Sequence, residues 1–551
     1  MEARATRVAA IGLDAAEWGL VAELLDEGEL PHLAALRARS AFARLEDPVD
    51  YRTGLVWEHF LTGRSAAGNE RWAAVEFDPS TYEVWQEGSR PTPPFYASDP
   101  PMPAVVFDVP YAPLVHRVDG AVVVGWGGHD PGYPRASVPP GLVDRIDDRF
   151  GPHPAFANDY TPVWHDAAAI DALCDALVVG SRRRIDAALW LLRQQPAWRL
   201  FVTVLSEPHS AGEQLWHGID PAHPLAGAPT AELARRRLRE VYRATDDAVG
   251  RLVAALPDDV TLVVFSMHGM GTNDADVASM VLLPELLHRL QGGQPLLADP
   301  DAPNWEANGF EPVIPDIGWS PFIGRSVRDL RPLARRVRSA VGARVRRPAP
   351  TRPAGRVGAL GRPIPMETRE SPDSIGVPHS SVDWQLALRY RRWWPAMGSF
   401  ALPTFYDGRI RLNVRGRERD GTIDPNDYDA TCEALERELM ACRDPRRDAP
   451  LVACVDRLRT ADDLGPGGPD ADLQVVWSGP ADALVHPSVG RIGPYPFRRT
   501  GGHSPNGFAF VAGPGIAPCD LGARSAMDVT PTVLRLLGHT PPGAVEGQSL
   551  L

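Results

Sequence analysis

The sequence contains no lysine, so every cationic side chain other than histidine is an arginine. This absence excludes chemistry that needs a lysine amine, namely Schiff-base catalysis, attachment of pyridoxal phosphate and the phosphate-binding lysine of a P-loop. Cysteine is scarce too, because the five cysteines are scattered and none forms a Cys-x-x-Cys pair. The sequence therefore indicates neither a disulfide framework nor a thiolate metal site.

Two further absences concern partners and location. No apolar run reaches the roughly 18 to 20 residues of a membrane span, and the N-terminus lacks the pattern of a signal peptide. The net charge of -13 argues against a nucleic-acid partner, because such proteins usually carry a basic face. We therefore expect a cytoplasmic protein without a membrane span and without nucleic-acid binding. The sequence carries no signal of oligomeric state.

The composition, with 44% hydrophobic and 23% charged residues, is that of a globular protein with a packed core. We expect one large core, formed by residues 1–294 and 381–551, because large α/β enzymes often reach this length with insertions. Residues 295–380 are rich in proline and glycine, with an arginine-dense stretch at 325–347. This insertion or cap segment is either a solvated helix or a lid that meets an anionic substrate.

Strand and helix patterns alternate through the first half of the chain, which predicts an α/β fold. Apolar runs at 8–13, 200–205 and 260–265 predict buried strands. The helical spacing of apolar residues in 167–193 and 231–255 predicts helices ahead of the second and third of these strands.

Polar side chains follow each of the three predicted strands. Asp14 comes after the first and His268 after the third, while the second leads into a predicted loop with the pattern His209-x-x-x-Glu213. Open α/β sheets bind ligands at the carboxyl ends of their strands, and imidazole and carboxylate both suit zinc. Two plainer interpretations stay open: Asp14 as the cap of a helix, and a surface loop that happens to be rich in histidine.

Six segments carry a family resemblance: IGLDAAEW, RTGLVWEHFLTG, SEPHSAGEQLWH, FSMHGMG, GGHSPNGFAFVAGPGI and DVTPTVLRLLG. In this order and at these intervals they resemble the type I phosphodiesterase/nucleotide pyrophosphatase branch of the alkaline phosphatase superfamily. The resemblance covers nearly the whole chain apart from 295–380. It implies a central, mostly parallel sheet flanked by helices, with a two-metal phosphoryl-transfer site, usually zinc, at its carboxyl edge.

The resemblance also implies roles for single residues. Thr53, nine residues before the Thr62 of a Thr-Gly turn, matches the nucleophile of the family. Asp14 matches the first metal ligand, His268 the histidine of an Asp-His-Gly motif, and His503 the last metal histidine. Two cations about 4 Å apart would lower the pKa of the Thr53 hydroxyl and neutralise the phosphoryl oxygens. Thr53 would then form a covalent phospho-enzyme that water clears.

The first departure from the family pattern exchanges two ligand types. Where the family has Asp-x-x-x-His, this chain has His209 and Glu213, and with His503 the set is still two histidines and one carboxylate.

The second departure removes a charge. Met267 stands where the family has the aspartate of Asp-His-Gly, and a thioether is a poor zinc ligand. The second metal site then keeps Asp14, Thr53 and His268, with Asn273 or Asp274 as conceivable substitutes.

Three functions fit these motifs. The first is a metal-dependent phosphoester hydrolase, most plausibly a phosphodiesterase, which uses Thr53 as nucleophile on a small phosphate ester and holds one or two ions of zinc or manganese. The second is a degenerate relative that binds a phosphate-like ligand without hydrolysis. The third is a single-metal enzyme for another transfer reaction. A sulfatase is disfavoured, because Thr53-Gly54 stands where its Cys-x-Pro-x-Arg motif would be.

Overall fold

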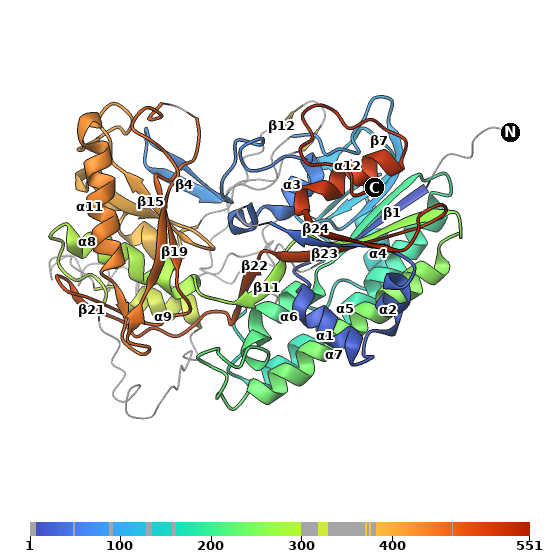
Figure 1. The fold of residues 1–551 in the computed structure, drawn as a ribbon, viewed down its shortest axis with the longest axis horizontal. Coiled ribbons are helices and arrows are strands. Elements are labelled where there is room, and N and C mark those ends of the chain that lie inside the picture. The colour runs from blue at the N-terminus through green and yellow to red at the C-terminus, as the bar shows by residue number, and fades with distance from the viewer. Residues whose placement is uncertain are drawn as a thin grey trace, which may run out of the picture.

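The computed structural model describes residues 7–47, 50–86, 92–127, 135–156, 161–298, 318–328, 370–371, 374–375, 382–465 and 467–551. These residues form two lobes, a larger one around a wide sheet and a smaller one with its own core (Figure 1). Most of the stretch 325–347 lies outside the described residues, so its assignment as an insertion or lid stays a prediction.

The larger lobe is built on a nine-stranded sheet in the order β24-β2-β23-β10-β1-β9-β5-β7-β8. Neighbouring strands from β10 to β7 pair in parallel, whereas β23 runs antiparallel to both β10 and β2, and β8 runs antiparallel to β7. The predicted α/β fold with a mostly parallel sheet is therefore confirmed. The strands are β1 (Arg7–Leu13), β2 (Ala41–Glu46), β5 (Met102–Phe107), β7 (Val118–Val124), β8 (Ala136–Val138), β9 (Leu200–Leu205), β10 (Val260–Ser266), β23 (Asn506–Ala512) and β24 (Cys519–Ser525).

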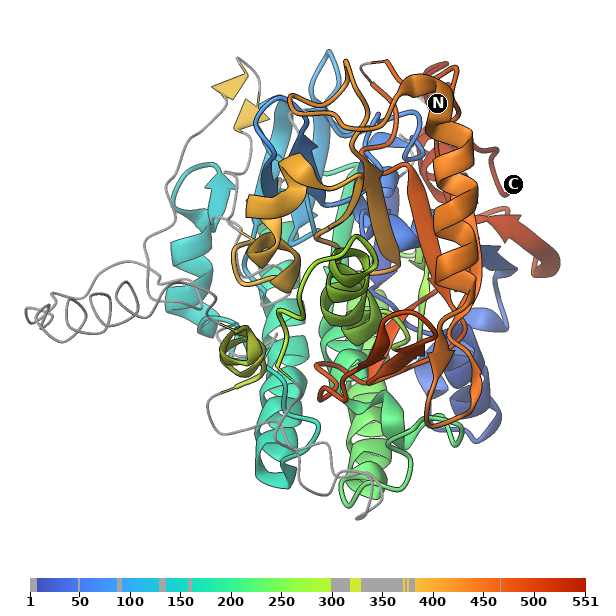
Figure 2. The ribbon, with the colours of Figure 1, turned by 90° about the vertical axis from the view of Figure 1, so that its left-hand side faces the viewer.

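Helices cover both faces of this sheet, and the central strand β1 shows why its sequence is apolar throughout. Val8 and Ala10 pack into a cluster with α3 (Val56–Thr62) and α12 (Val529–Leu536). Ala9, Ile11 and Leu13 face the opposite layer. A strand buried on both faces needs an unbroken apolar run rather than an alternating one. The opposite layer consists of α1 (Trp18–Asp26), α2 (Pro31–Arg37), α4 (Leu142–Phe150), α5 (Ala167–Gln194) and α7 (Ala231–Ala255), of which α5 and α7 run side by side (Figure 2).

The smaller lobe has a separate hydrophobic core around an antiparallel sheet in the order β14-β15-β19-β18. The hairpin of β3 (Val75–Asp78) and β4 (Glu83–Gln86) reaches into this lobe, since Phe77 and Tyr82 join its core. Its other elements are α8 (Leu283–Leu290), α9 (Trp319–Ser326), β14 (Ser399–Leu402), β15 (Gly408–Leu412), α11 (Tyr428–Met440), β16 (Arg443–Asp444), β17 (Ala449–Pro450), β18 (Val452–Arg457), β19 (Leu473–Trp477), β20 (Leu484–His486) and β21 (Gly490–Ile492).

Two neighbouring strands, β11 (Gly269–Thr272) and β22 (Gly501–Ser504), connect the lobes between β10 and β23. β11 leaves the larger lobe directly after β10, and β22 returns just before β23. The two pair antiparallel, with Met270 opposite His503 (Figure 1). This ribbon therefore carries the end of β10 and the last predicted metal histidine to the junction of the lobes.

A small sheet joins β6 (Leu114–Val115), β12 (Glu370–Ser371) and β13 (Ser374–Ile375). None of the described helices combines the length and the apolar composition needed to cross a membrane.

Candidate active site

Thr53 ends a short helical turn, η1 (Asp50–Thr53), just ahead of α3. The backbone N–H of Leu55 donates a hydrogen bond to Thr53 Oγ1 at 3.0 Å, which fixes the direction of the hydroxyl. Between them Gly54 has φ +73°, a conformation that strains any residue with a Cβ. Gly63, with φ +66°, ends α3, so the predicted Thr-Gly turn after the helix is present.

Asp14 lies directly after β1, at the carboxyl edge of the sheet, and is fully buried. The indole Nε1 of Trp57 donates a hydrogen bond to Asp14 Oδ1 at 2.6 Å, which ties the end of β1 to the helix that follows Thr53. This approach requires Gly12, because a Cβ there would lie 2.3 Å from the indole ring. The alternative that Asp14 caps a helix is wrong, since Glu17 caps α1 by accepting from Gly19 N–H.

His209 and Glu213 lie on a helix, α6 (Glu207–Leu215), and the predicted loop at this place is wrong. Their separation of four residues puts both side chains on the same helical face, where His209 Nε2 lies 3.9 Å from Glu213 Oε1. Both residues are buried, at 4% and 2% relative exposure. The plainer interpretation of a His-rich surface loop is therefore wrong as well.

The structure brings the predicted ligands into one continuous series. His209 Nε2 lies 2.9 Å from His503 Nε2, and the rings of His503 and His268 are 4.2 Å apart. His268 Nε2 lies 3.8 Å from Asp14 Oδ1. The turn that ends at Thr53 packs against β22, the strand that carries His503. Asp14, His268, His503, His209 and Glu213 thus follow one another along the carboxyl edge, beside the Thr53 turn.

The two histidines are spaced like ligands of one cation. Two ligands about 2.0 Å from a tetrahedral zinc ion are separated by about 3.3 Å. His209 Nε2 lies 2.9 Å from His503 Nε2, close to that value, and 3.9 Å from Glu213 Oε1, above it. The ligand atoms of the three residues do not all lie within 4.8 Å of one another, so Glu213 would have to shift to join both histidines on one ion. The pair of Asp14 and His268, at 3.8 Å, offers a second cation position with one carboxylate and one imidazole.

Asn273 does not replace the missing aspartate of the second position, and Asp274 stays a candidate substitute. Met267 is 1% exposed and belongs to the apolar cluster that contains Trp57 and Phe60. Asn273 holds the backbone instead, since its Nδ2 donates to Gly501 O and its Oδ1 accepts from the N–H groups of residues 275 and 276. Burial, with repulsion by Asp407, raises the pKa of Asp274 to about 7.

Arg499 is a central residue of the site that the sequence analysis missed. Its guanidinium donates to Glu213 Oε1, and to both oxygens of Asp276 at 2.7 and 2.8 Å. Burial raises the pKa of Glu213, and the charges of Arg499 and Arg498 oppose that shift. The carboxylate of Glu213 is therefore shared between the histidine pair and a fixed internal cation. The only sequence signal was an arginine pair just before His503.

The smaller lobe supplies two more residues that sequence reasoning missed. Tyr406 places its hydroxyl 3.2 Å from His503 Nε2, and the carboxylate Oδ2 of Asp407 lies 2.9 Å from Nη1 of Arg52, the neighbour of Thr53. Burial raises the pKa of the Tyr406 phenol, so that it stays protonated. Nothing in the local sequence marks a lone tyrosine between two predicted strands as part of a site.

The sequence of this protein matches a known protein family over the range that contains most of these residues. The family described as type I phosphodiesterase / nucleotide pyrophosphatase matches residues 8–307, more than half of the 551 residues. The chain belongs to this family. The matched range includes Asp14, Thr53, His209, Glu213 and His268, whereas His503 lies beyond it.

Solved structures of other proteins are similar to this family member over nearly its whole length. Phosphonoacetate hydrolase from Sinorhizobium meliloti, in complex with phosphonoformate, shares 13% identity over 97% of this chain and 96% of its own, with a TM-score of 0.43. An inactive variant of murine ectonucleotide pyrophosphatase / phosphodiesterase 5, in complex with AMP, shares 11% sequence identity. The match covers 98% of this chain and 97% of that protein, with a TM-score of 0.44. The alkaline phosphatase PafA shares 10% sequence identity over 100% of this chain and 99% of its own, with a TM-score of 0.49. No curated protein matches the sequence.

A second buried network supports α6 in this phosphodiesterase family member. Arg184 donates to Asp108 Oδ2 at 2.6 Å, to Glu207 Oε1 at 3.0 Å and to Ser206 Oγ at 3.1 Å. Burial opposes the charge on Glu207, but Arg184 and His153 outweigh it and lower the pKa of that carboxyl to about 2. The network joins the ends of β5 and β9 to the first turn of α6, and so fixes the helix that carries His209.

The remaining histidines near α6 serve the packing of the loop that follows. His217 Nε2 lies 3.2 Å from Thr230 Oγ1, and His223 Nε2 lies 3.1 Å from the carbonyl of Thr500.

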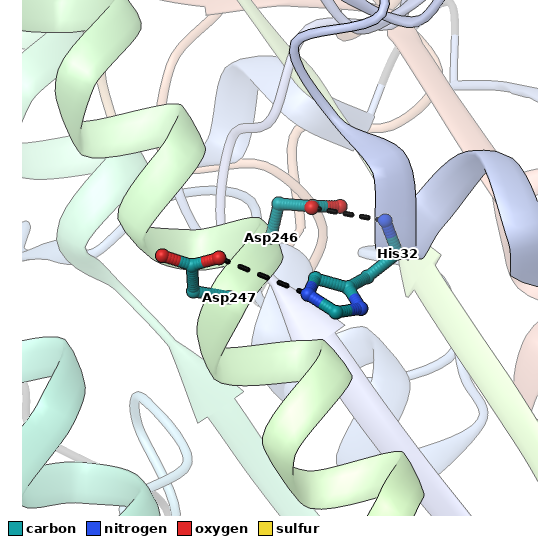
Figure 3. Close-up of side chains that lie close together, drawn as sticks. All are labelled: His32, Asp246 and Asp247. Carbon is teal, nitrogen blue, oxygen red and sulfur yellow. Dashed lines mark hydrogen bonds and ion pairs between the residues drawn. The ribbon is translucent and has the colours of Figure 1, made fainter.

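Another His/Asp cluster lies on the helical layer, away from the carboxyl edge (Figure 3). His32, Asp246 and Asp247 are the one group of three or more such residues, among those the structure describes, whose ligand atoms all lie within 4.8 Å of one another. Asp246 accepts from the backbone N–H groups of His32 and Leu33 at 3.0 and 2.7 Å, so it holds the first turn of α2 against α7. Helix capping accounts for this carboxylate without a metal ion.

Proposed function

We propose that this protein is a metal-dependent phosphoester hydrolase, most plausibly a phosphodiesterase, with Thr53 as its nucleophile and a small phosphate ester as its substrate. The observation that carries the proposal is the series of ligand-type side chains at the carboxyl edge, next to the turn of Thr53, in a member of the type I phosphodiesterase/nucleotide pyrophosphatase family. The cytoplasmic location expected from the sequence stays a prediction.

Two groups of residues would hold divalent cations, zinc or alternatively manganese. His209, His503 and Glu213 form the first, and Asp14, His268 and Thr53 the second. Bound cations would lower the pKa of the Thr53 hydroxyl and offset charge on the phosphoryl oxygens. The first group has the richer donor set, two imidazoles and a carboxylate, whereas Met267 leaves the second with one imidazole, one carboxylate and the Thr53 hydroxyl.

The chain's own residues define the sequence of bond changes. Thr53 Oγ1 attacks phosphorus, the bond to the leaving oxygen breaks, and the leaving alcohol takes up a proton. The Leu55 N–H keeps Oγ1 oriented during this attack. Water then attacks the phosphorus of phospho-Thr53, which releases a phosphate monoester and restores the threonine hydroxyl.

A second candidate function is binding of a phosphate-like ligand without hydrolysis. Two observations favour it: Met267 lies in an apolar cluster where the family has a carboxylate, and Arg499 already engages Glu213. Both reduce the negative charge available to a metal pair. A single-metal enzyme for another transfer reaction would follow from the same two features.

Replacement of the nucleophile separates these functions. Thr53→Ala should abolish hydrolysis of bis(p-nitrophenyl) phosphate in zinc or manganese while the fold and the metal content stay largely intact. Thr62→Ala is the matched control, because the Thr62 hydroxyl bonds to Glu58 O and Asn69 at the far end of α3. Full turnover by Thr53→Ala would remove Thr53 from the mechanism, and no turnover by the unaltered protein would favour the binding function.

A further inference from the structure

The loop between β14 and β15 brings the smaller lobe onto the nucleophile. This loop, residues 403–407, carries Tyr406 and Asp407 side by side. Asp407 pairs with Arg52, and Tyr406 lies against Gly54, so the loop contacts the residue on each side of Thr53. The nucleophile of the larger lobe is thus enclosed by a segment more than 300 residues away in the sequence.

The ring of Tyr406 spans the distance from the nucleophile segment to the histidine pair. Its Cε2 lies 2.5 Å from the position that a Cβ on Gly54 would take, so only glycine fits beneath it. Its ring centroid is 4.7 Å from that of His503, and its hydroxyl is 3.2 Å from His503 Nε2. The residue as a whole keeps part of its surface exposed.

The hydroxyl lies beside the series of proposed cation ligands, because His503 Nε2 is 2.9 Å from His209 Nε2 and the His503 ring centroid is 4.2 Å from that of His268. The phenol at this point is a hydrogen-bond donor close to these ligands. Phosphoryl transfer builds up negative charge on the equatorial oxygens of the phosphoryl group, which preorganised donors stabilise.

We propose that Tyr406 is a catalytic residue that donates a hydrogen bond to a non-bridging oxygen of the phosphoryl group transferred to Thr53. This assignment rests on the proposed function and adds a substrate contact from the smaller lobe. It also gives the site a hydrogen-bond donor that stabilises negative charge, beside a second cation position that has few ligands, Asp14 and His268. The smaller lobe then completes the active site rather than only covering it.

Tyr406→Phe tests the assignment, since it removes the donor and keeps the ring against Gly54. Tyr82→Phe is the matched control, because its buried hydroxyl bonds to Asn413 Oδ1 at 2.8 Å within the core of the smaller lobe. We expect Tyr406→Phe to lower kcat on bis(p-nitrophenyl) phosphate by about 100-fold, as loss of one oxyanion donor does, with KM changed by less than about threefold. Binding of orthovanadate, measured by calorimetry, should weaken, while metal content and melting temperature should match those of Tyr82→Phe.

Four outcomes would overturn the assignment, the proposed function or both. A kcat within about threefold of the unaltered enzyme, with unchanged vanadate binding, would refute the Tyr406 contact alone. Loss of metal, with activity restored by excess zinc, would show that Tyr406 supports His503 and not the substrate. An unaltered protein that binds vanadate through Tyr406 but hydrolyses no ester would end the proposed function and leave the phosphoryl contact supported. An unaltered protein that does neither would refute both.

Discussion

Arg499 is the residue whose replacement should most change both the stability and the metal binding of this protein. Its guanidinium bridges Glu213 on α6 and Asp276, and it also donates to the carbonyl of Phe405 at 3.2 Å. The two carboxylates are 2% and 1% exposed. Arg499→Met keeps most of the volume of the side chain and removes its charge, so it leaves two buried carboxylates without their main counter-charge.

The expected loss follows from the burial of those carboxylates. Removing one partner of a buried ion pair typically costs about 3 to 5 kcal/mol in the free energy of unfolding. Asp276 keeps a weaker contact with Arg498, whose Nη1 lies 3.6 Å from its Oδ2. We therefore expect the total loss for Arg499→Met to stay within that range, although two carboxylates lose their partner. In the double variant with Glu213→Gln, one of the two unbalanced charges is gone, and the total loss should be smaller than for Arg499→Met alone.

The loss should depend on pH in a definite direction. Burial opposes ionisation of Asp276, but Arg499 and Arg498 outweigh it and lower the pKa of that carboxyl. Stability from a depressed carboxyl pKa is present above the unfolded value, about 3.8, and is lost as the pH falls through the folded value. The contribution of Asp276 to the difference between Arg499→Met and the unaltered protein should therefore be full at pH 7 to 8 and shrink as the pH falls below about 4.

Urea unfolding followed by circular dichroism, with and without zinc, is the assay. Zinc should recover part of the stability of Arg499→Met, because Glu213 is then available to the cation beside His209 and His503. Arg446→Met is the control: it breaks an ion pair with the buried Asp482 in the smaller lobe and should not respond to zinc. A loss below about 1 kcal/mol, or an equal response to zinc in both variants, would refute the assignment of Arg499 as an internal counter-cation.

Two further substitutions probe the second cation position and the loop beside it. Met267→Asp buries a carboxylate in the apolar cluster that contains Phe60, so it should lower the melting temperature of the metal-free protein. Addition of zinc should restore the melting temperature and raise the metal content above that of the unaltered protein. If zinc has no effect, the result would argue against a cation at Asp14 and His268. Asp274→Asn tests a carboxyl whose pKa burial and Asp407 raise to about 7. In the unaltered protein, the stability that the protonated Asp274 carboxyl provides is complete below about pH 3.8 and is lost as the pH rises through 7. The asparagine of the variant does not titrate, so the variant avoids this loss. The free energy of unfolding gained by Asp274→Asn should therefore grow by about 2 to 3 kcal/mol from pH 5 to pH 8. A gain that is the same at both pH values would contradict the raised pKa.

The residues that sequence analysis placed correctly are those at the ends of readable strands. Asp14 follows β1 directly, and His268 comes two residues after the last residue of β10. Since parallel strands end at the same edge of a sheet, the position of each of these side chains followed from its strand alone. α6 was predicted as a loop, and its sequence contains Pro208 and Gly212, which disfavour a helix interior. The proline stands in the first turn, where helices tolerate it, and the glycine leaves space for Met270, whose Cγ would lie 3.0 Å from a Cβ there.

The residues that could not be predicted are held by contacts between distant segments. Tyr406 reaches the site only because the smaller lobe packs against the turn of Thr53, and Arg499 is buried only because α6 and the loop of Asp276 close around it. Local patterns carry no information on such contacts, since the residues involved are more than 90 positions apart. Likewise, the bond of Trp57 to Asp14 follows from the packing of α3 on β1.

Metal content and turnover, measured on the same chelator-free preparation, test the proposed metal-dependent chemistry of Thr53 most directly. Elemental mass spectrometry should find one or two zinc or manganese ions per chain, and the preparation should hydrolyse bis(p-nitrophenyl) phosphate in a reaction that a chelator stops and Thr53→Ala lacks. Protein that holds no metal, gains none on addition of zinc or manganese, and hydrolyses no phosphate ester would contradict the proposal. Such a result would leave a phosphodiesterase family fold that serves binding instead of catalysis.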